Sequence, residues 1–272
     1  MDWIEADWPA PPWVRAISTT RCGGTSSGPY SGLNLGDHVG DDPVCVAENR
    51  ERLRLGLGLP APPHWLCQVH GCAVVAADDP LADCKADARI AWRPGQVCAV
   101  LTADCLPILL SDCAGTRVAA VHAGWRGLLA GVIEAAVARL ATPPESLLAW
   151  LGPAIGPGAF EVGAEVREGF VARDPQAEVA FIPQGQAKWL ADLPLLARQR
   201  LARLGCNGVW GGNFCTFEDS RRFFSYRRDG ATGRMASLIW IEPETRGSRF
   251  PPPSISTYHA GRIQACDEVN LG

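Results

Sequence analysis

Three residues that can bind a metal or carry out nucleophilic chemistry lie in matching places in the sequence. Cys105 precedes the apolar run 108–110, His122 ends the run 118–121, and His70 ends the segment WLCQVH. Strand ends that meet at one sheet edge are where α/β-type folds form their sites. Two imidazoles and one thiolate also match a catalytic zinc centre that keeps its fourth position open. The alternative is that each is an ordinary structural residue, since spacing alone does not bring them together.

Composition narrows the classes of function. The chain has 272 residues, is 47% hydrophobic and carries a net charge of −4, so it has no basic footprint for nucleic acid or an anionic membrane. We expect no membrane span, because Asp104 and Asp112 interrupt the best apolar run. The eleven cysteines are scattered without a C-x-x-C pair, and the acidic N-terminus is unlike a secretory signal. These features favour a cytoplasmic protein with reduced thiols.

The elements that must position the three residues are predicted from periodicity. Residues 125–140 form the clearest amphipathic helix, and further helices are expected over 44–58, 163–172 and 190–204. Strands are expected within 15–36, at 65–71, as a pair around the Pro94-Gly95 turn, at 147–151, and in two segments after residue 207, the last with a loop at Asp229-Gly230. The fold class is therefore α/β (α+β), with mixed β-sheets and flanking helices. Residues 1–242 are expected to form one domain, and 243–272 an irregular C-terminal tail.

Several motifs in order, TTRCGGTSSG, QVHG, KADA, TADCLPILL, VHAGWRG, LGPAIGPGAFEVG and SYRRDGATGRM, resemble the bacterial laccase-domain family. That family is also called polyphenol oxidase, YfiH-like or purine nucleoside phosphorylase, and the likeness spans residues 14–242. The resemblance implies a single domain with the broad fold of the cytotoxic necrotizing factor catalytic domain. It also implies a zinc ion held by His70, Cys105 and His122.

The name laccase implies a multicopper oxidase, and the residue count argues against it. Multicopper centres need about ten histidine ligands, including a His₂Cys type 1 site. The chain has five histidines and no His-x-His pair. Copper is therefore expected only as an adventitious ion at the same trio.

The resemblance implies action on purine nucleosides instead, by phosphorolysis of adenosine, inosine or guanosine and by deamination of adenosine. Zinc suits deamination because it lowers the pKa of a bound water to about 7, which then acts as the nucleophile. Asp104 is a candidate to move the proton or to support ligand Cys105, and a strand-end cap is the equally weighted alternative.

Phosphorolysis needs a cationic pocket for phosphate, and four arginines are candidates. Arg21 lies in a Gly-rich loop that could form an anion nest, Arg126 opens a helix, and Arg227 and Arg228 lie in SYRRDG. Each could instead form a structural ion pair, above all Arg228 with Asp229. Asn34 is a candidate for binding a purine edge or ribose hydroxyl, or for bonding its own turn.

Other interpretations stay open. A metal-free hydrolase or deamidase would use Cys105 as nucleophile and His122 as base, and would have no need of His70. Family members are also named as peptidoglycan editing factors, which implies an amidase acting on a nucleotide-linked amino acid of a cell-wall precursor. A purely binding role would leave the trio without a purpose. The expected partners are a small nucleoside and phosphate, and the chain is expected to be a monomer.

Overall fold

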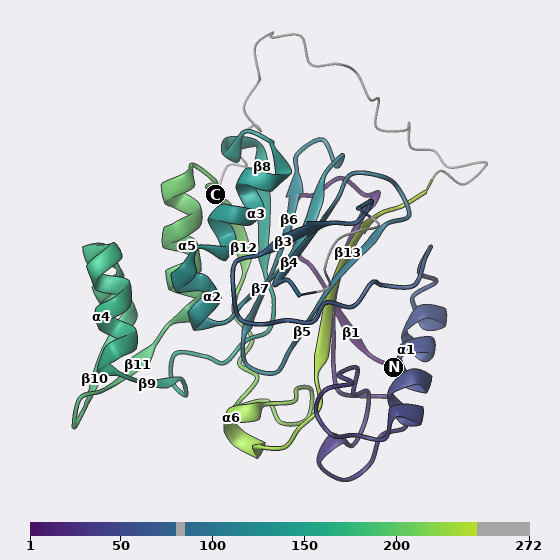
Figure 1. The fold of residues 1–272 in the computed structure, drawn as a ribbon, viewed down its shortest axis with the longest axis horizontal. Coiled ribbons are helices and arrows are strands. Elements are labelled where there is room, and N and C mark those ends of the chain that lie inside the picture. The colour runs from purple at the N-terminus through teal and green to yellow at the C-terminus, as the bar shows by residue number, and fades with distance from the viewer. Residues whose placement is uncertain (80–84, 244–272) are drawn as a thin grey trace, which may run out of the picture.

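The structure, a computed structural model, describes residues 1–79 and 85–243, and it is built on two packed β-sheets (Figure 1). The first sheet is antiparallel and has four strands, in the order β1 (Trp3–Glu5), β2 (Val14–Thr19), β13 (Met235–Ile241) and β5 (Val97–Thr102).

The second sheet is mixed. Its six strands run in the order β12 (Gly208–Gly211), β8 (Leu147–Leu151), β6 (Leu106–Asp112), β7 (Val118–Ala123), β4 (Ala88–Ala91) and β3 (Val74–Ala76). The two edge pairs, β12–β8 and β3–β4, are parallel, and the central pairs are antiparallel.

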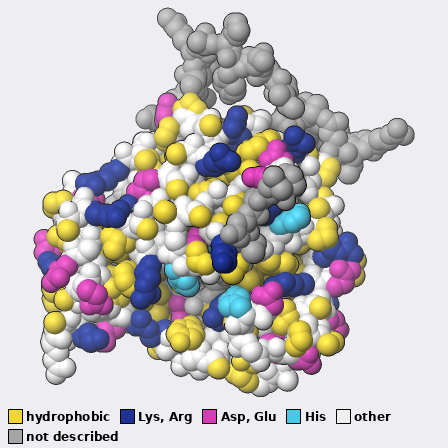
Figure 2. All heavy atoms as spheres, viewed as in Figure 1, with side chains coloured by type: hydrophobic (Ala, Val, Ile, Leu, Met, Phe, Trp, Pro, Cys, Tyr) yellow, Lys and Arg dark blue, Asp and Glu magenta, His cyan; other side chains and the backbone are white. Residues whose placement is uncertain are grey.

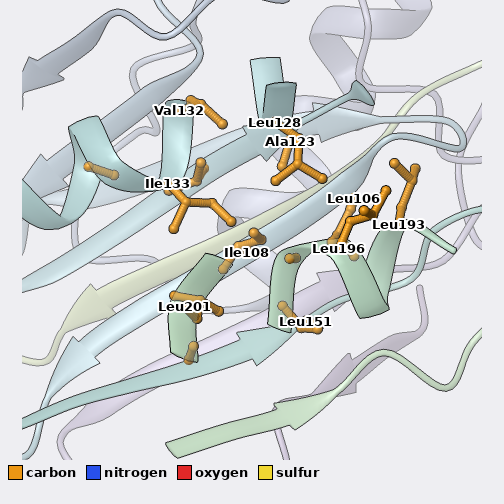
Figure 3. Packing of buried hydrophobic residues seen from close by; sticks show 14 of the residues in the cluster. Leu106, Ile108, Ala123, Leu128, Val132, Ile133, Leu151, Leu193, Leu196 and Leu201 are labelled. Atoms are coloured by element: carbon orange, nitrogen blue, oxygen red, sulfur yellow. The ribbon is translucent and has the colours of Figure 1, made fainter. Parts of the chain in front are cut away.

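Alternating side chains bury both faces of the central strands. In β6, Leu109 joins a cluster with Val100 and Ile239 of the first sheet, whereas Ile108 and Leu110 face the opposite side. There both pack with α3 (Val132–Leu140) and α5 (Leu193–Leu204). Figure 3 shows Ile108 between Ile133 of α3 and Leu196 of α5. On the far side, α1 (Pro43–Gly56) places Leu53 against the outer face of the first sheet. The layers therefore run helix, sheet, sheet, helices.

The remaining elements lie at the periphery of these layers. A three-stranded antiparallel sheet projects from the body together with α4 (Ala164–Arg173) (Figure 1). Its strands are β10 (Phe181–Gly185), β11 (Lys188–Ala191) and β9 (Glu161–Gly163). Two short helices, α2 (Trp125–Ala130) and α6 (Tyr226–Asp229), flank the functional site. The 3-10 turns are η1 (Gly28–Tyr30), η2 (Pro144–Ser146) and η3 (Pro175–Ala180).

Mixed sheets flanked by helices confirm the predicted fold class, and the helices over 44–58, 163–172 and 190–204 are found within a few residues of their predicted ends. The single helix predicted over 125–140 is wrong. Gly131 has a left-handed φ of 103°, and its N–H bonds back to Gly127, which ends α2 before α3 begins.

Two strand predictions and one loop prediction are corrected. The segment 65–71 is irregular, because the Gln68 side chain, in place of a backbone, bonds both the N–H and the C=O of Leu101. The two strands around Pro94-Gly95 are real but do not pair, because that turn carries the chain from one sheet to the other. The predicted loop at Asp229-Gly230 is the end of helical turn α6, where the Ser225 side chain accepts from the N–H of Arg228.

The predicted C-terminal tail lies outside the described residues, apart from Pro243. Within 1–79 and 85–243, no helix is long and apolar enough to cross a membrane. Acidic and basic side chains are interspersed on the face of the molecule drawn in Figure 2.

Candidate metal centre

His70, Cys105 and His122 converge, although they come from three different local structures. His70 lies in the irregular segment before β3, Cys105 in the turn between β5 and β6, and His122 near the end of β7. One donor atom from each lies within 4.8 Å of the other two, and Cys105 Sγ is 3.9 Å from His70 Nε2. Burial rises from exposed His70 through half-buried Cys105 to buried His122, so the cluster opens to solvent on the side of His70.

One buried carboxylate, Asp87, organises two of these three residues. Asp87 Oδ1 lies 2.8 Å from His122 Nδ1, which leaves His122 Nε2 to interact with the other members of the cluster. The same carboxylate accepts the backbone N–H groups of His70 at 2.9 Å and Gly71 at 2.7 Å. These contacts hold His70 in a left-handed conformation, with φ of 60°. A carboxylate behind a histidine is the usual support of a metal ligand.

Two glycines of HAGWRG are required by close approaches in the cluster. A Cβ on Gly124 would lie 2.9 Å from Cys105 Sγ and 3.0 Å from His70 Cδ2. A Cβ on Gly127 would lie 2.8 Å from the carbonyl oxygen of Gly71, so this glycine lets α2 approach the loop of His70. Any larger residue at position 124 would therefore push Cys105 and His70 away from their present places.

The charges of the cluster favour a thiolate. Burial opposes ionisation of Cys105, but the charge and hydrogen bond of His122, followed by those of His70, lower the pKa of the thiol to about 6. Burial likewise opposes a charge on His122, and Cys105 and Asp87 raise its pKa to about 9. In contrast, burial in the core of β5 raises the pKa of the Cys98 thiol to about 12.

The donor set fits a zinc-type ion. Two imidazoles and a thiolate are ligands that zinc accepts, and three protein ligands leave one position of a tetrahedron open. The three donor atoms lie within 4.8 Å of one another, so one ion can be reached by all three. Within the described residues, no further histidine, cysteine or carboxylate belongs to this cluster.

Asp104 lies beside the cluster, but its carboxylate points into the protein. Its Oδ1 accepts the Thr216 hydroxyl at 2.7 Å, and its Oδ2 accepts the backbone N–H of Arg227 at 2.7 Å. Its φ of 97° is uncommon for a residue other than glycine. The contacts tie the turn that carries Cys105 to the start of α6.

Two of the predicted binding residues are occupied by the protein itself. Arg228 uses all of its N–H donors, two on Asp229 and three on the carbonyls of Thr216, Phe217 and Phe223.

Asn34 is fully buried. Its amide donates to Gly36 and Asp41 and accepts the N–H groups of Gly36 and Arg234. Both side chains support local structure, which matches the structural alternative in each case.

The other three predicted arginines each have partners of their own, and Arg126 and Arg227 are exposed. The guanidinium of Arg21 stacks 4.5 Å from the Phe224 ring and donates to the carbonyls of Ser220 and Ser31. Arg126 is exposed and stacks on neighbouring Trp125. Arg227 donates to the carbonyl of Glu161. The three guanidinium groups therefore contact different parts of the protein.

The sequence prediction missed Asp87 and Arg234 as residues of this region. Asp87 had a signal in KADA, because a single acid inside an apolar strand start needs a buried partner. Arg234 in TGRM directly precedes β13, and its guanidinium lies within electrostatic range of Cys105 and Asp104. Neither spacing nor periodicity places it there.

Known proteins that resemble this chain in sequence belong to one family. The profile of a family described as multi-copper polyphenol oxidoreductase laccase matches residues 15–242. Purine nucleoside phosphorylase YfiH of Escherichia coli strain K12 is 56% identical over 239 residues, which cover 88% of this chain and 98% of that protein. Purine nucleoside phosphorylase PA4543 of Pseudomonas aeruginosa is 55% identical, with 88% of this chain and 98% of the relative covered.

Solved structures of similar proteins have the same fold as this chain. Neisseria meningitidis protein NMB0706 superimposes with a TM-score of 0.86 at 50% identity, covering 89% of this chain and 100% of that one. YlmD from Geobacillus stearothermophilus gives a TM-score of 0.79 at 31% identity, over 86% and 94% of the two chains. With this fold and these relatives, the chain belongs to the laccase-like YfiH family described as multi-copper polyphenol oxidoreductase laccases.

Proposed function

We propose that this protein is a zinc-dependent enzyme of purine nucleosides, which cleaves adenosine, inosine or guanosine with phosphate and deaminates adenosine. The observation that carries the proposal is the convergence of His70, Cys105 and His122 behind one orienting carboxylate, Asp87. The relatives that are called purine nucleoside phosphorylases supply the substrate class.

The chain's own residues would divide the work as follows. His70 Nε2, Cys105 Sγ and His122 Nε2 would hold the ion, with Asp87 fixing the His122 ring and the His70 loop. A zinc ion bound there would supply a Lewis acid with an open position, which suits hydrolytic loss of an amino group. The exposure of His70 leaves that side accessible to a nucleoside.

Phosphorolysis places a different demand on the site. An oxygen of hydrogen phosphate forms a bond to C1′, the bond between C1′ and N9 breaks, and the base leaves with the electron pair and a proton. The protein must bind phosphate next to the nucleoside and neutralise its charge. Arg21 and Arg227 stay candidates for this, whereas Arg228 has no free donor.

The proposal is tested by metal analysis and product identification on one set of proteins. Metal content is measured by mass spectrometry for the wild type and for His70→Ala, Cys105→Ala and His122→Ala. Adenosine turnover is then followed with and without phosphate, since adenine with ribose 1-phosphate reports phosphorolysis and inosine reports deamination. We expect about one zinc per wild-type chain and the loss of both zinc and turnover in all three variants.

A second candidate is a metal-free cysteine hydrolase, favoured by the geometry of the same residues. Asp87, His122 and Cys105 lie in the order of an acid, a base and a nucleophile, and the pKa of the Cys105 thiol is lowered. In that case His70→Ala keeps its activity and chelation does not affect the wild type. Activity lost on chelation and in His70→Ala would exclude this candidate.

A further inference from the structure

Arg234 lies at the end of the first sheet nearest to the candidate metal centre. It directly precedes Met235, which pairs with Thr102 at the end of β5, three residues before Cys105. Its backbone is held on the other side, where its N–H donates to Asn34 at 2.8 Å and its carbonyl accepts from Leu35 at 3.1 Å. The strand pairing of Met235 and these backbone hydrogen bonds together fix the position of the Arg234 Cα.

The guanidinium of Arg234 is half-buried and has no carboxylate partner in the described part of the chain. Its Nη1 donates to the carbonyls of Thr232 and Gly233, both at 3.0 Å, while Nε and Nη2 have no partner among residues 1–79 and 85–243. Gly36 makes room for the side chain, since a Cβ there would lie 2.7 Å from Arg234 Cγ. Neither Nε nor Nη2 is among the buried side-chain atoms of the described chain that lack a partner, so both donors reach solvent and are available to a ligand.

The guanidinium of Arg234 lies within electrostatic range of Cys105, one of the candidate ligands, and of its neighbour Asp104. Burial lowers the pKa of Arg234, and the charges that oppose this effect come from Cys105 first and then from Asp104, Tyr226 and Tyr30. Arginine keeps its charge under such shifts. The hydroxyls of Thr102 and Thr232, at the same end of the sheet, are buried without a partner in the described residues, which is rare for polar groups that meet no ligand or water.

We propose that Arg234 binds inorganic phosphate beside the metal centre. Its free Nε and Nη2 donors form the planar fork that grips two oxygens of a tetrahedral anion. Arg228 lacks such donors, and Arg126 is exposed and stacked on Trp125. This inference rests on the proposed function and assigns its co-substrate site to a residue that the family motifs alone did not single out.

The test measures binding of inorganic phosphate to the metal-loaded protein by calorimetry, separately from catalysis. The variants are Arg234→Gln and Arg234→Lys. The matched control is Arg198→Gln, because Arg198 also donates to two backbone carbonyls, those of Val209 and Gly211, at the far edge of the second sheet. Metal content is measured in each protein.

We expect Arg234→Gln to weaken phosphate binding by about 10-fold or more, and to raise the KM for phosphate without changing that for adenosine. Arg234→Lys should recover part of the affinity, and Arg198→Gln should match the wild type. Phosphate binding that depends on Arg234 supports this inference even if the wild type turns over no nucleoside, a result that would overturn only the proposed function. Equal affinity in Arg234→Gln, no binding by the wild type, or loss of metal from Arg234→Gln would each overturn it.

Discussion

The two regions that carry the candidate chemistry are built in opposite ways. The residues of the metal cradle, His70, Cys105 and His122, converge from separate segments and turn their donor atoms toward one another. In contrast, most of the candidate arginines donate to backbone carbonyls. These are Arg21, Arg227, Arg228 and Arg234. Arg228 alone donates to three carbonyls.

The difference follows from what supports each side chain. A buried carboxylate and a strand position fix the direction of the His122 ring before any ligand binds. A loop has few backbone partners of its own, so a nearby guanidinium with its N–H donors becomes the partner of the loop. A cluster of arginines in a loop sequence therefore predicts a ligand site less reliably than donors that stand at strand ends.

The largest effect is expected where the cradle has no room to adjust. Gly124→Ala places a methyl group 2.9 Å from Cys105 Sγ and 3.0 Å from His70 Cδ2, so the ligands must separate. Metal sites tolerate shifts of only about 0.2 Å in ligand distance. We expect metal affinity to fall by at least about 100-fold while the fold is kept, as measured by metal titration and circular dichroism.

The control for Gly124→Ala is Gly158→Ala, where the new methyl group meets only Glu218 Oε1 at an ordinary 3.6 Å. Wild-type metal affinity in Gly124→Ala would show that the ion does not lie between Cys105 and His70.

The next effect tests the carboxylate behind the cradle. Asp87→Asn replaces one carboxylate oxygen, which accepts hydrogen bonds, with an amide nitrogen, which donates them. Whichever way the amide is turned, this nitrogen meets another donor, either a backbone N–H of His70 or Gly71 or the ring N–H of His122. We expect a drop of about 10–100-fold in metal affinity, measured by competition with a chelator.

Asp112→Asn is the matched control for Asp87→Asn. Asp112 is also buried, and accepts from Thr116 and the N–H of Arg117 at the other end of the second sheet. It should lower stability while leaving metal affinity unchanged. Equal metal affinity in the two variants would mean that Asp87 supports only the fold.

The same contrast separates what the sequence predicts from what it does not. Ligand types beside apolar runs predict His70, Cys105 and His122. The strand that holds His122 and the strands on either side of the Cys105 turn are also predicted from the sequence. The position of His70 was predicted on a strand, and the structure has an irregular segment held by Asp87 and by the Gln68 side chain. Side-chain bonds over a distance of 17 residues or more leave no periodic signal.

The predicted pairing of the two strands around Pro94-Gly95 is wrong for a related reason. Local turn residues predicted a hairpin across Pro94-Gly95, but the choice of partners depends on burial in two different sheets. Likewise, the free donors of Arg234 depend on which carbonyls lie nearby in space, and no motif encodes this. Residue types beside apolar runs therefore indicate candidate ligands, whereas the donors that a side chain has free depend on how the folded chain packs around it.

Arg228→Gln tests the structural side of the comparison. The change removes the ion pair with Asp229 and the bonds to the carbonyls of the 216–223 segment. We expect a loss of about 2 kcal/mol in the free energy of unfolding, measured by urea denaturation, with metal content unchanged. Arg126→Gln, which affects an exposed side chain, should change stability by less than about 0.5 kcal/mol. Similar stability in both variants would show that the Arg228 bonds contribute little.

The smallest effect is expected at Asp104, and it decides between two roles. Asparagine can satisfy both neighbours, since its carbonyl can accept the N–H of Arg227 while its amide donates to the Thr216 hydroxyl, which can also accept. It also tolerates the left-handed φ of 97°. If Asp104 only positions the turn of Cys105, Asp104→Asn should lower kcat by less than about 10-fold, whereas removal of a proton-transferring group costs about 100-fold or more. Asp104→Ala, which loses both bonds, should be the less stable of the two variants, and a kcat equally low in both would place Asp104 in the proton transfer itself.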